Sequence, residues 1–366
     1  MNNGSAEAIP IVHDGVMYIV EPGAVVRAVD ATNGDSVWEY RHDAGDAAGR
    51  ARTKTLAIYG DVILYTAPDG YIVALDAVNG EVRWQTYAGE ADHTSGPVAV
   101  NGKVISGRAC ARTRESCFIA AHDIETGEEL WKFFTVPGPG EPGYETWGNP
   151  SPETHDRNMA STWGLPGSYD PETNTVLWGV ANPMPNTRAA RHDGEVDTIP
   201  RTSPSDLYSN STLALDPDTG ELKWYFQHLP GDDWDEDYTN ERILTTIRFN
   251  PDPEYVKWFN PNVPRGEERD ATVMVGEGGG IFVNDRRTGE FLWATPFPFD
   301  TERFLISNID GATGRTELNW DLVLEGFAGE NHLTLLLQHG PVSAVFRHPD
   351  NSLYIPMSTP LNIVDS

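Results

Sequence analysis

The sequence predicts an all-β fold, a β-propeller built of four-stranded blades, and three observations support this. A segment with an Asp, a Gly four residues later and a Trp eight residues later recurs along the chain. A second hairpin pattern lies upstream of the first three of these segments. The 11 Trp, 35 Gly and 27 Pro among 366 residues favour short strands and tight turns over long helices.

The recurring segment has five clear copies and one degenerate copy, SYDPETNTVLW, with Asn174 in the place of the Gly. Asn tolerates the left-handed backbone that Gly adopts at such a turn. With the degenerate copy included, the first five Asp residues are 46, 47, 47 and 46 residues apart, a regularity that indicates repeats of one structural unit. The clear copies are Asp30/Gly34/Trp38, Asp76/Gly80/Trp84, Asp123/Gly127/Trp131, Asp216/Gly220/Trp224 and Asp285/Gly289/Trp293.

Each copy is typical of a strand, a turn and a second strand. The Asp side chain accepts hydrogen bonds from backbone amides of the turn, and the Gly supplies a positive φ. One Trp at a constant position in every repeat suits docking between adjacent blades. Upstream, PIVHDGVMYIV, LAIYGDVILYT and PVAVNGKVISG each predict another hairpin, which brings the repeat to four strands in roughly 47 residues, the size of a propeller blade.

We therefore expect one propeller domain, residues 1–366, with six to seven blades visible. Two insertions, near residues 135–160 and 249–268, are long for connecting loops and favour a functional role. The predicted blades cover roughly residues 8–45, 55–90, 95–135, 155–182, 205–228 and 270–297, with a partial blade at 340–358.

Charge and cysteine content limit the classes of function. A formal net charge of −29 argues against nucleic acid or an anionic membrane as partner, and no stretch is long and apolar enough to span a bilayer. The start of the chain has no signal-peptide pattern. Cys110 and Cys117 favour a disulfide and an oxidising compartment. As a metal site the pair is incomplete, and two unrelated buried thiols are the alternative.

Residues 208–238, YSNSTLALDPDTGELKWYFQHLPGDDWDEDY, resemble the quinoprotein alcohol dehydrogenase family, and the resemblance extends from about residue 8 to 358. It implies an eight-bladed propeller with tryptophan-docking repeats, and pyrroloquinoline quinone beside Ca²⁺ or a lanthanide(III) ion. The implied reaction oxidises an alcohol to an aldehyde or ketone and passes electrons to a cytochrome c in the periplasm. Compared with that family the ring is expected to be incomplete; a smaller closed propeller is the alternative.

The resemblance also assigns the catalytic base and the metal ligands. The family's PGDxWD segment places its base on Asp235, which would take the alcohol proton. Asp237 would add a second carboxylate to the metal, which favours a trivalent ion; on an extended strand both side chains would face one side. WGVANP makes Asn182 an amide ligand. A solvated acidic loop and an ordinary turn are the alternatives.

Four further residues correspond to the family's quinone contacts. Trp163 would form the floor beneath the quinone ring, or serve only for packing between blades. Thr94 and Ser95 match a polar pair near the quinone's edge. Lys54 stands where the family often has an Arg that pairs with a quinone carboxylate, and an exposed lysine is the alternative.

The adjacent cysteine pair of the methanol enzymes is absent, which favours a larger alcohol over methanol in the enzyme hypothesis. Three other features favour a second hypothesis, an inactive propeller that binds a protein or polymer, and the first is the incomplete ring. Strict alignment places Arg112 where the family has a metal-binding Glu, and only a shifted loop would bring in Glu115. Glu277 replaces a family Lys or Arg near the quinone oxygen, where a carboxylate would repel the reduced quinone.

Overall fold

The computed structural model describes residues 8–50, 52–90, 92–195, 200–298 and 304–322, and the strand pair 346–347 and 353–354. These residues are mostly antiparallel strands with a few short helices, which confirms the all-β prediction. None of the helices in these ranges is long and apolar enough to cross a membrane. The chain divides into two compact units. Unit 1 comprises Met1–Thr135, Ser161–Gly179 and Ala214–Lys223, and unit 2 comprises Val136–Ala160, Val180–Leu213 and Trp224–Ser366.

Unit 1 begins with three four-stranded sheets, each with its strands in sequence order. The first sheet contains β1 (Ile11–His13), β2 (Val16–Glu21), β3 (Val25–Asp30) and β4 (Ser36–Arg41). The second contains β5 (Ala57–Tyr59), β6 (Val62–Thr66), β7 (Tyr71–Asp76) and β8 (Val82–Tyr87). The third contains β9 (Pro97–Val100), β10 (Lys103–Ser106), β11 (Phe118–Asp123) and β12 (Glu129–Phe134).

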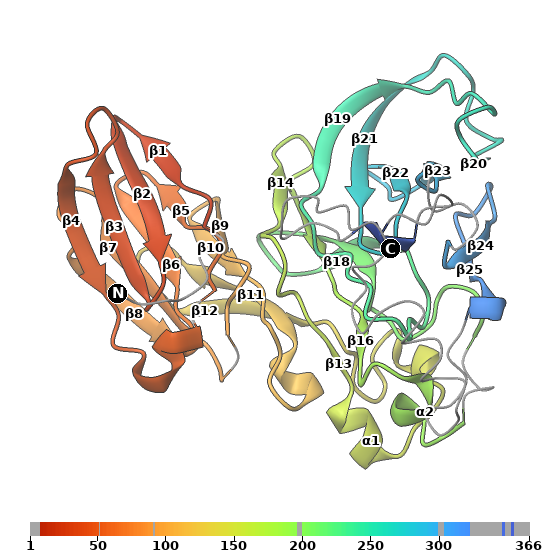
Figure 1. Cartoon of the computed structure of the whole chain (residues 1–366), viewed down its shortest axis with the longest axis horizontal. Helices are drawn as coiled ribbons and strands as arrows, with labels where there is room; N and C mark the ends of the chain where they lie inside the picture. The colour runs from red at the N-terminus through yellow and green to blue at the C-terminus, as the bar shows by residue number, and fades with distance from the viewer. Residues whose placement is uncertain are drawn as a thin grey trace. The chain divides into compact units, whose positions relative to one another are not determined.

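The first two sheets lie side by side and share a core (Figure 1). Tyr18, Val26 and Trp38 of the first sheet pack with Ile63 and Val73 of the second. Burial of apolar surface between the sheets, at roughly 25 cal/mol per Å², is the main stabilising term of such an interface.

The predicted upstream hairpins are confirmed. β1 pairs with β2, β5 with β6 and β9 with β10, each antiparallel. In the first hairpin φ is 48° at Asp14 and 78° at Gly15, and in the third it is 49° at Asn101 and 72° at Gly102. Two successive positive φ values are the signature of the type I′ turn, whose twist matches that of the strands.

The Asp-to-Gly segments form the turns that their sequence predicts. The Gly80 amide donates to the Asp76 carbonyl over 2.8 Å, and Asp76 Oδ1 accepts from the Val78 amide over 2.9 Å. Gly80 has φ +75°, in the region that glycine adopts without strain. Local hydrogen bonding therefore fixes this turn.

The repeated Trp residues contact the turn of the next clear copy of the segment, which for Trp131 lies beyond the degenerate copy. The Trp38 indole N–H donates to the Ala77 carbonyl over 2.9 Å, and a Cβ added to Gly80 would lie 2.6 Å from the Trp38 ring. Equivalent indole N–H bonds of 2.9 Å join Trp84 to Ile124 and Trp131 to Pro217. Within unit 2, the Trp224 ring packs against Gly289, where an added Cβ would lie 2.7 Å from it, but its indole N–H makes no such bond.

The fourth four-stranded sheet departs from the prediction. Its order is β14 (Ser168–Asp170), β15 (Thr175–Gly179), β17 (Ser211–Leu215) and β18 (Leu222–Gln227). Residues 155–182 and 205–228 were predicted to form separate blades, whereas β14 and β15 of the first range lie in one sheet with β17 and β18. Asn174 has the expected left-handed backbone, with φ 47°. Trp178, however, is fully buried against Gly107 and Gly167, so the degenerate copy supplies the first half of a blade.

Unit 2 contains a five-stranded sheet with the order β19-β21-β22-β23-β20. Its strands are β19 (Ile243–Arg248), β21 (Glu268–Val275), β22 (Ile281–Asp285), β23 (Phe291–Thr295) and β20 (Trp258–Phe259). The expected insertion at 249–268 therefore adds β20 as an edge strand beside β23. Aromatic residues dominate the adjacent core, which includes Phe226, Tyr238, Phe282 and Phe304.

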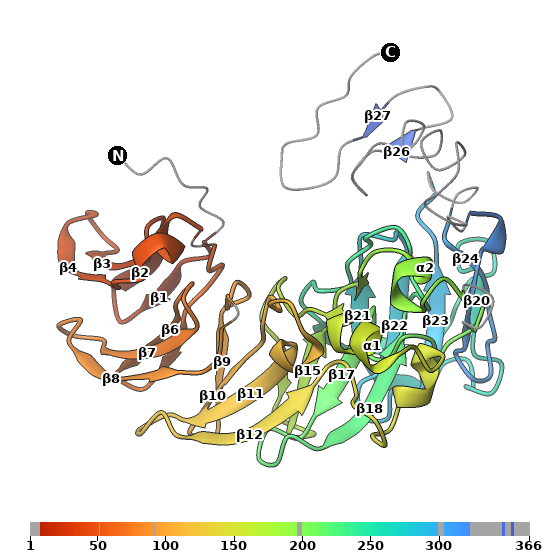
Figure 2. The same cartoon turned by 90° about the horizontal axis from the view of Figure 1, so that it is seen from below.

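Short elements complete unit 2. The other insertion, 135–160, forms η3 (Tyr144–Trp147), α1 (Pro152–Arg157) and β13 (Met159–Ala160), which pairs with β16 (Pro183–Met184). Figure 2 shows α1 beside α2 (Arg188–Arg191). The remaining elements are η1 (Gly45–Arg50), η2 (Arg114–Ser116), η5 (Trp320–Leu322), β24 (Ile306–Ile309), β25 (Thr316–Leu318), β26 (Phe346–Arg347) and β27 (Leu353–Tyr354).

The expected partial blade at 340–358 lies largely outside the described residues. Within it, β26 and β27 form an antiparallel pair.

Candidate functional site

Unit 1 brings together three of the residues assigned to the quinone. The Lys54 ammonium nitrogen lies 4.5 Å from the centroid of the Trp163 ring, and Lys54 is only 8% exposed. Thr94 donates its hydroxyl to the Trp163 carbonyl over 2.7 Å, and the Thr94 carbonyl accepts from the Lys54 amide over 3.0 Å. A buried cation beside an aromatic face suits a planar anionic ligand. Ser95 follows Thr94 in the chain and is fully buried.

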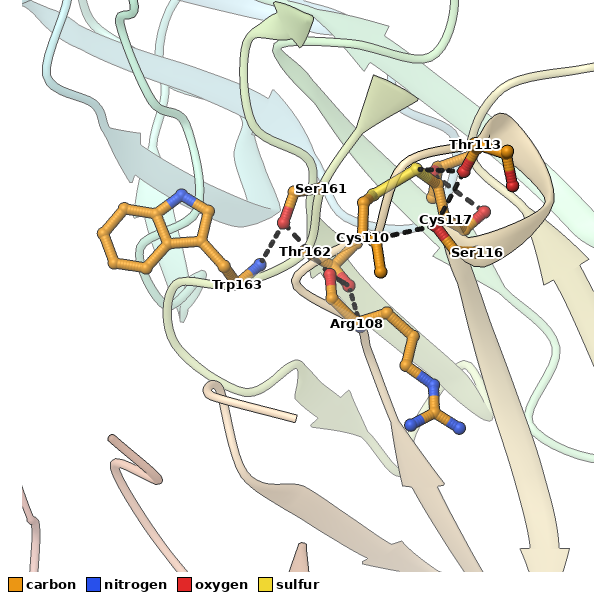
Figure 3. Close-up of a disulfide and its surroundings, with 10 residues drawn as sticks. Arg108, Cys110, Thr113, Ser116, Cys117, Ser161, Thr162 and Trp163 are labelled. Atoms are coloured by element: carbon orange, nitrogen blue, oxygen red, sulfur yellow. Dashed lines mark hydrogen bonds between the residues drawn. A yellow bond between two sulfur atoms is a disulfide. The ribbon is translucent and has the colours of Figure 1, made fainter. Parts of the chain in front are cut away.

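The loop that carries Trp163 is tied to the segment before the disulfide (Figure 3). The Arg108 amide donates to Thr162 Oγ1 over 2.6 Å, and Ser161 donates its hydroxyl to the Arg108 carbonyl over 3.0 Å. Ser161 Oγ also accepts from the Trp163 amide over 3.1 Å. These bonds set the backbone of Trp163, whose indole projects away from the sulfur atoms in Figure 3.

Cys110 and Cys117 form a disulfide, as the sequence favoured. The loop that they close contains Arg112 and Glu115, the two residues considered for the place of the family's metal-binding Glu. Glu115 has a side chain that is 68% exposed, with Arg114 3.4 Å away. Arg112 is exposed, with φ 74°. Neither side chain is buried beside Asp235, Asp237 or Asn182, so the metal site proposed below includes neither of them.

In unit 2, two amides hold the carboxylate of Asp235. Both Asn186 and Asn182 hydrogen-bond to it, and each lowers its pKa, but burial of the surrounding segment is the larger effect and raises that pKa. The Asp235 side chain nevertheless remains accessible to solvent. A carboxylate with a raised pKa that solvent can reach is suited to accept a proton.

Asp237 lies on the same amide-bearing segment as Asp235, but the geometric reason given for the pair is wrong. Residues 231–242 form an irregular loop, and Asp235 is in the left-handed region with φ 71°. Asp237 is 7% exposed, and its Oδ1 accepts from the Asn182 backbone amide over 3.2 Å. The three predicted ligands are therefore grouped by tertiary contacts, because no strand periodicity operates in this loop.

Glu277 joins this group. Its amide donates to the Asp237 carbonyl over 2.9 Å, and its Oε2 accepts from the Asp237 amide over 3.3 Å. Burial raises the pKa of Glu277, the Asp237 amide opposes that shift, and the charge of Asp235 adds to it. The flanking Gly276 and Gly278 leave room for the Tyr238 ring, which an added Cβ at either position would strike.

The donor atoms in unit 2 are oxygens of carboxylates and amides, which suit a hard cation such as Ca²⁺ or a lanthanide(III) ion. In the described ranges of the chain, no group of three or more His, Cys, Asp or Glu side chains could hold a metal ion. A cation at Asp235 and Asp237 would therefore also need the amide oxygen of Asn182 or Asn186.

Asn186 was not identified from the sequence. Its one signal is its place in NPMPN, four residues after Asn182 and directly after Pro185. The segment is not helical at Asn182, so no periodic pattern shows that the two amides converge. The Met184–Pro185 peptide bond is cis and lies between them.

Residues 1–297 match the protein family described as glucose/ethanol/alcohol dehydrogenase, beta-propeller domain. The chain therefore belongs to this quinoprotein dehydrogenase family, and its fold is that of the family's β-propeller domain. Two similar curated proteins come from Pseudomonas putida. Quinohemoprotein alcohol dehydrogenase ADH IIB is 32% identical over 86% of this chain and 44% of its own length. Quinoprotein alcohol dehydrogenase PedH is 34% identical over 80% of this chain and 48% of its own length.

A solved structure of the same class of enzyme shares the fold. The quinohemoprotein alcohol dehydrogenase ADHIIG of Pseudomonas putida HK5 superimposes with a TM-score of 0.74 at 27% identity, covering 99% of this chain and 51% of its own. This chain thus spans about half the length of the relatives that it matches.

Proposed function

We propose that this chain carries residues for the oxidation of an alcohol to an aldehyde or ketone by pyrroloquinoline quinone and a metal ion. The observation that carries the proposal is Asp235, a solvent-accessible carboxylate held by Asn182 and Asn186. The names of the relatives, alcohol dehydrogenases of the quinoprotein and quinohemoprotein classes, support it.

In this proposal Asp235 accepts the hydroxyl proton of the alcohol at a carboxylate oxygen. The two amides orient the carboxylate, so that one oxygen stays directed at the substrate. Asp237 and Asn182 would hold the metal ion, together with Asp235. Lys54 would pair with a quinone carboxylate, and Trp163, Thr94 and Ser95 would hold the ring. When bound, the quinone supplies the hydride acceptor and the metal ion supplies Lewis acidity at its carbonyl.

The identity of the metal ion follows from charge. Two carboxylates in one donor set favour a trivalent lanthanide over Ca²⁺, because each adds a hard anionic oxygen. Glu277 places a third carboxyl group near Asp235; burial raises the pKa of Glu277, and the charge of Asp235 raises it further. We therefore propose a lanthanide(III) ion, with Ca²⁺ as the alternative.

We further propose a periplasmic setting and a cytochrome c as electron acceptor. The net charge of −29 would attract a basic redox partner. The family resemblance supplies the compartment, and a disulfide-bonded Cys110–Cys117 pair suits one that is oxidising.

For the architecture, we propose that the four-stranded and five-stranded sheets are blades of an eight-bladed propeller, and that residues 1–366 supply part of one such domain. The indole contacts of Trp38, Trp84 and Trp131 with the next turn support their assignment as docking residues.

Reconstitution of the purified 366-residue chain tests the function. Pyrroloquinoline quinone would be added with CaCl₂ or LaCl₃ in parallel, and reduction of an artificial dye by a panel of alcohols would be followed. We expect alcohol-dependent dye reduction, and its loss in Asp235→Asn while the quinone absorbance of the bound protein is retained. Unchanged turnover in Asp235→Asn would remove that residue as the base.

The alternative function is that of a propeller which binds a protein or polymer without turnover. Glu277 favours it, because a carboxylate next to Asp235 would repel a reduced, anionic quinone. Folded chain that binds no quinone with either metal would support this alternative.

A further inference from the structure

Four buried charges connect α2 to the loop that carries Asp235. Arg191 Nε donates to Asp206 Oδ2 over 3.0 Å, and Arg191 also reaches Asp233 Oδ1 at 3.4 Å. Arg188 Nε lies 3.5 Å from Asp233 Oδ2. All four residues are at most 4% exposed. They form a net-neutral chain in the order Asp206, Arg191, Asp233 and Arg188, which we call the buried tetrad.

The tetrad holds the loop at several points. The Arg188 backbone amide donates to Asp233 Oδ1 over 2.8 Å, and its guanidinium donates to the Gly231 carbonyl. Gly231 has φ +53°, and a Cβ there would strike the Arg188 guanidinium. The start of the loop thus lies against Arg188, and Asp233 is two residues before Asp235.

The same segment of chain contacts Asp235 itself. Asn182 and Asn186, which hydrogen-bond to the Asp235 carboxylate, precede α2 directly. Arg191 donates to the Pro185 carbonyl over 2.8 Å, which ties the guanidinium to the stretch between the two amides. The segment 182–191 therefore contacts Asp235 through amides and its neighbour Asp233 through arginines.

Stability alone is a weak explanation for such a network. Removing two charges from water is costly, and replacement of a buried ion pair by apolar side chains of similar volume is often neutral or stabilising. Ion pairs with fixed geometry do, however, specify the relative placement of the segments that they join. The tetrad joins the two segments that meet at the Asp235 carboxylate.

We infer that Arg191 and Arg188 are positioning residues for Asp235, acting through Asp233. They hold the 230–237 loop in the position where the Asp235 carboxylate contacts the amides of Asn182 and Asn186. This inference rests on the proposed function only for its kinetic consequence, since the position of the loop is measurable without quinone or metal.

The test removes Arg191 and Asp206 together, in the double variant Arg191→Met with Asp206→Leu. Asp233 keeps its ion pair with Arg188, and His192 Nε2 loses its bond to Asp206 Oδ1. The full chain would be labelled with 5-fluorotryptophan, and the ¹⁹F resonance of Trp234, between Asp233 and Asp235, would be assigned with Trp234→Phe. We expect the Trp234 resonance to shift or broaden in the double variant. In the reconstituted protein we expect kcat to fall about 100-fold, the scale of a displacement of about 1 Å, with KM changed less than about threefold.

The matched control is Arg27→Met with Glu21→Leu, which removes a 2.7 Å ion pair on the surface of unit 1 and should leave the Trp234 resonance and kcat unchanged. If the double variant does not fold, the Trp234 resonance would be measured in the single variant Arg191→Lys instead. Lysine keeps the charge but has no planar fork to bridge two carboxylates, so a Trp234 shift is again expected.

A folded variant with an unchanged Trp234 resonance would overturn the inference. An altered resonance in a chain that shows no dehydrogenase activity at all would leave the inference standing and count against the proposed function. The two failures are therefore distinguishable.

Discussion

Substitution of the turn glycine Gly80 by Ala measures how much the Trp38 contact contributes to the fold. The new Cβ would lie 2.6 Å from Trp38 Cε3 and 2.7 Å from Cδ2, closer than carbon atoms pack. The left-handed backbone, with φ +75°, costs about 1–2 kcal/mol for a residue with a Cβ. Overpacking against the ring adds about 1–3 kcal/mol. Gly80→Ala should therefore lower the free energy of unfolding by about 2–5 kcal/mol.

The first repeat offers a matched control. Gly34 occupies the same turn position with φ +82°, and an added Cβ meets nothing within 4 Å. Gly34→Ala should therefore cost only the backbone part, about 1–2 kcal/mol. Both variants would be unfolded in urea and followed by tryptophan emission. Equal losses for the two would refute the reasoning.

A double-mutant cycle isolates the contact itself. In a Trp38→Ala background the ring is gone, so Gly80→Ala should lose its overpacking part and cost the same as Gly34→Ala. Residues in direct contact give coupling energies of about 0.5–3 kcal/mol. A coupling near zero would mean that the Trp38 ring does not oppose a Cβ at Gly80.

Three further predictions concern the disulfide, a buried carboxyl group and the proposed metal site. The double variant Cys110→Ser with Cys117→Ser should lose about 2.5 kcal/mol of stability by the loop-entropy relation, and an unchanged melting temperature would contradict this. Burial raises the pKa of Asp232 to about 7, above the unfolded value of about 3.9, so the free energy of unfolding should fall between about pH 4 and pH 7 and then level off. In urea titrations at pH 5 and pH 7, Asp232→Asn should lack this fall. An equal fall in Asp232→Asn and in the unaltered chain would contradict the prediction. Asp237→Ala should weaken Tb³⁺ binding, followed by luminescence, more than Ca²⁺ binding. An equal loss of affinity for the two ions would contradict the proposed lanthanide preference.

The turns of the repeats were predictable from sequence because their interactions are local. Asp76 bonds to amides two and three residues later, and Gly80 needs a positive φ that few other residues adopt. Neither depends on distant parts of the chain. The alternation of hairpins followed from the same local patterns.

The assignment of residues 168–179 to a separate blade failed for the opposite reason. The segment does form the predicted hairpin, with Ser168 opposite Leu177. The other two strands of its sheet, β17 and β18, come only after a long insertion. Their pairing with β15 is a non-local contact. Spacing in the sequence could not distinguish a complete blade from half of one.

The candidate site was predictable in its residue types and only partly in its geometry. The resemblance placed Asp235, Asp237 and Asn182 together, and tertiary contacts group them in unit 2. It also placed Lys54 and Thr94 with Trp163, although Lys54 was equally compatible with an exposed position. Burial of the lysine against the indole could not be inferred, because the two lie far apart in the sequence.

The sequence by itself determined the repeating strand-turn-strand unit, the family and which polar residues are candidates for the proposed quinone and metal sites. Tertiary structure alone decided that Asp235 adopts a left-handed conformation in an irregular loop, that Asn186 joins Asn182 on its carboxylate, and that Arg188 and Arg191 hold the preceding Asp233. Local propensities act over a few residues, whereas these contacts depend on burial and charge pairing between segments that only the complete fold brings together.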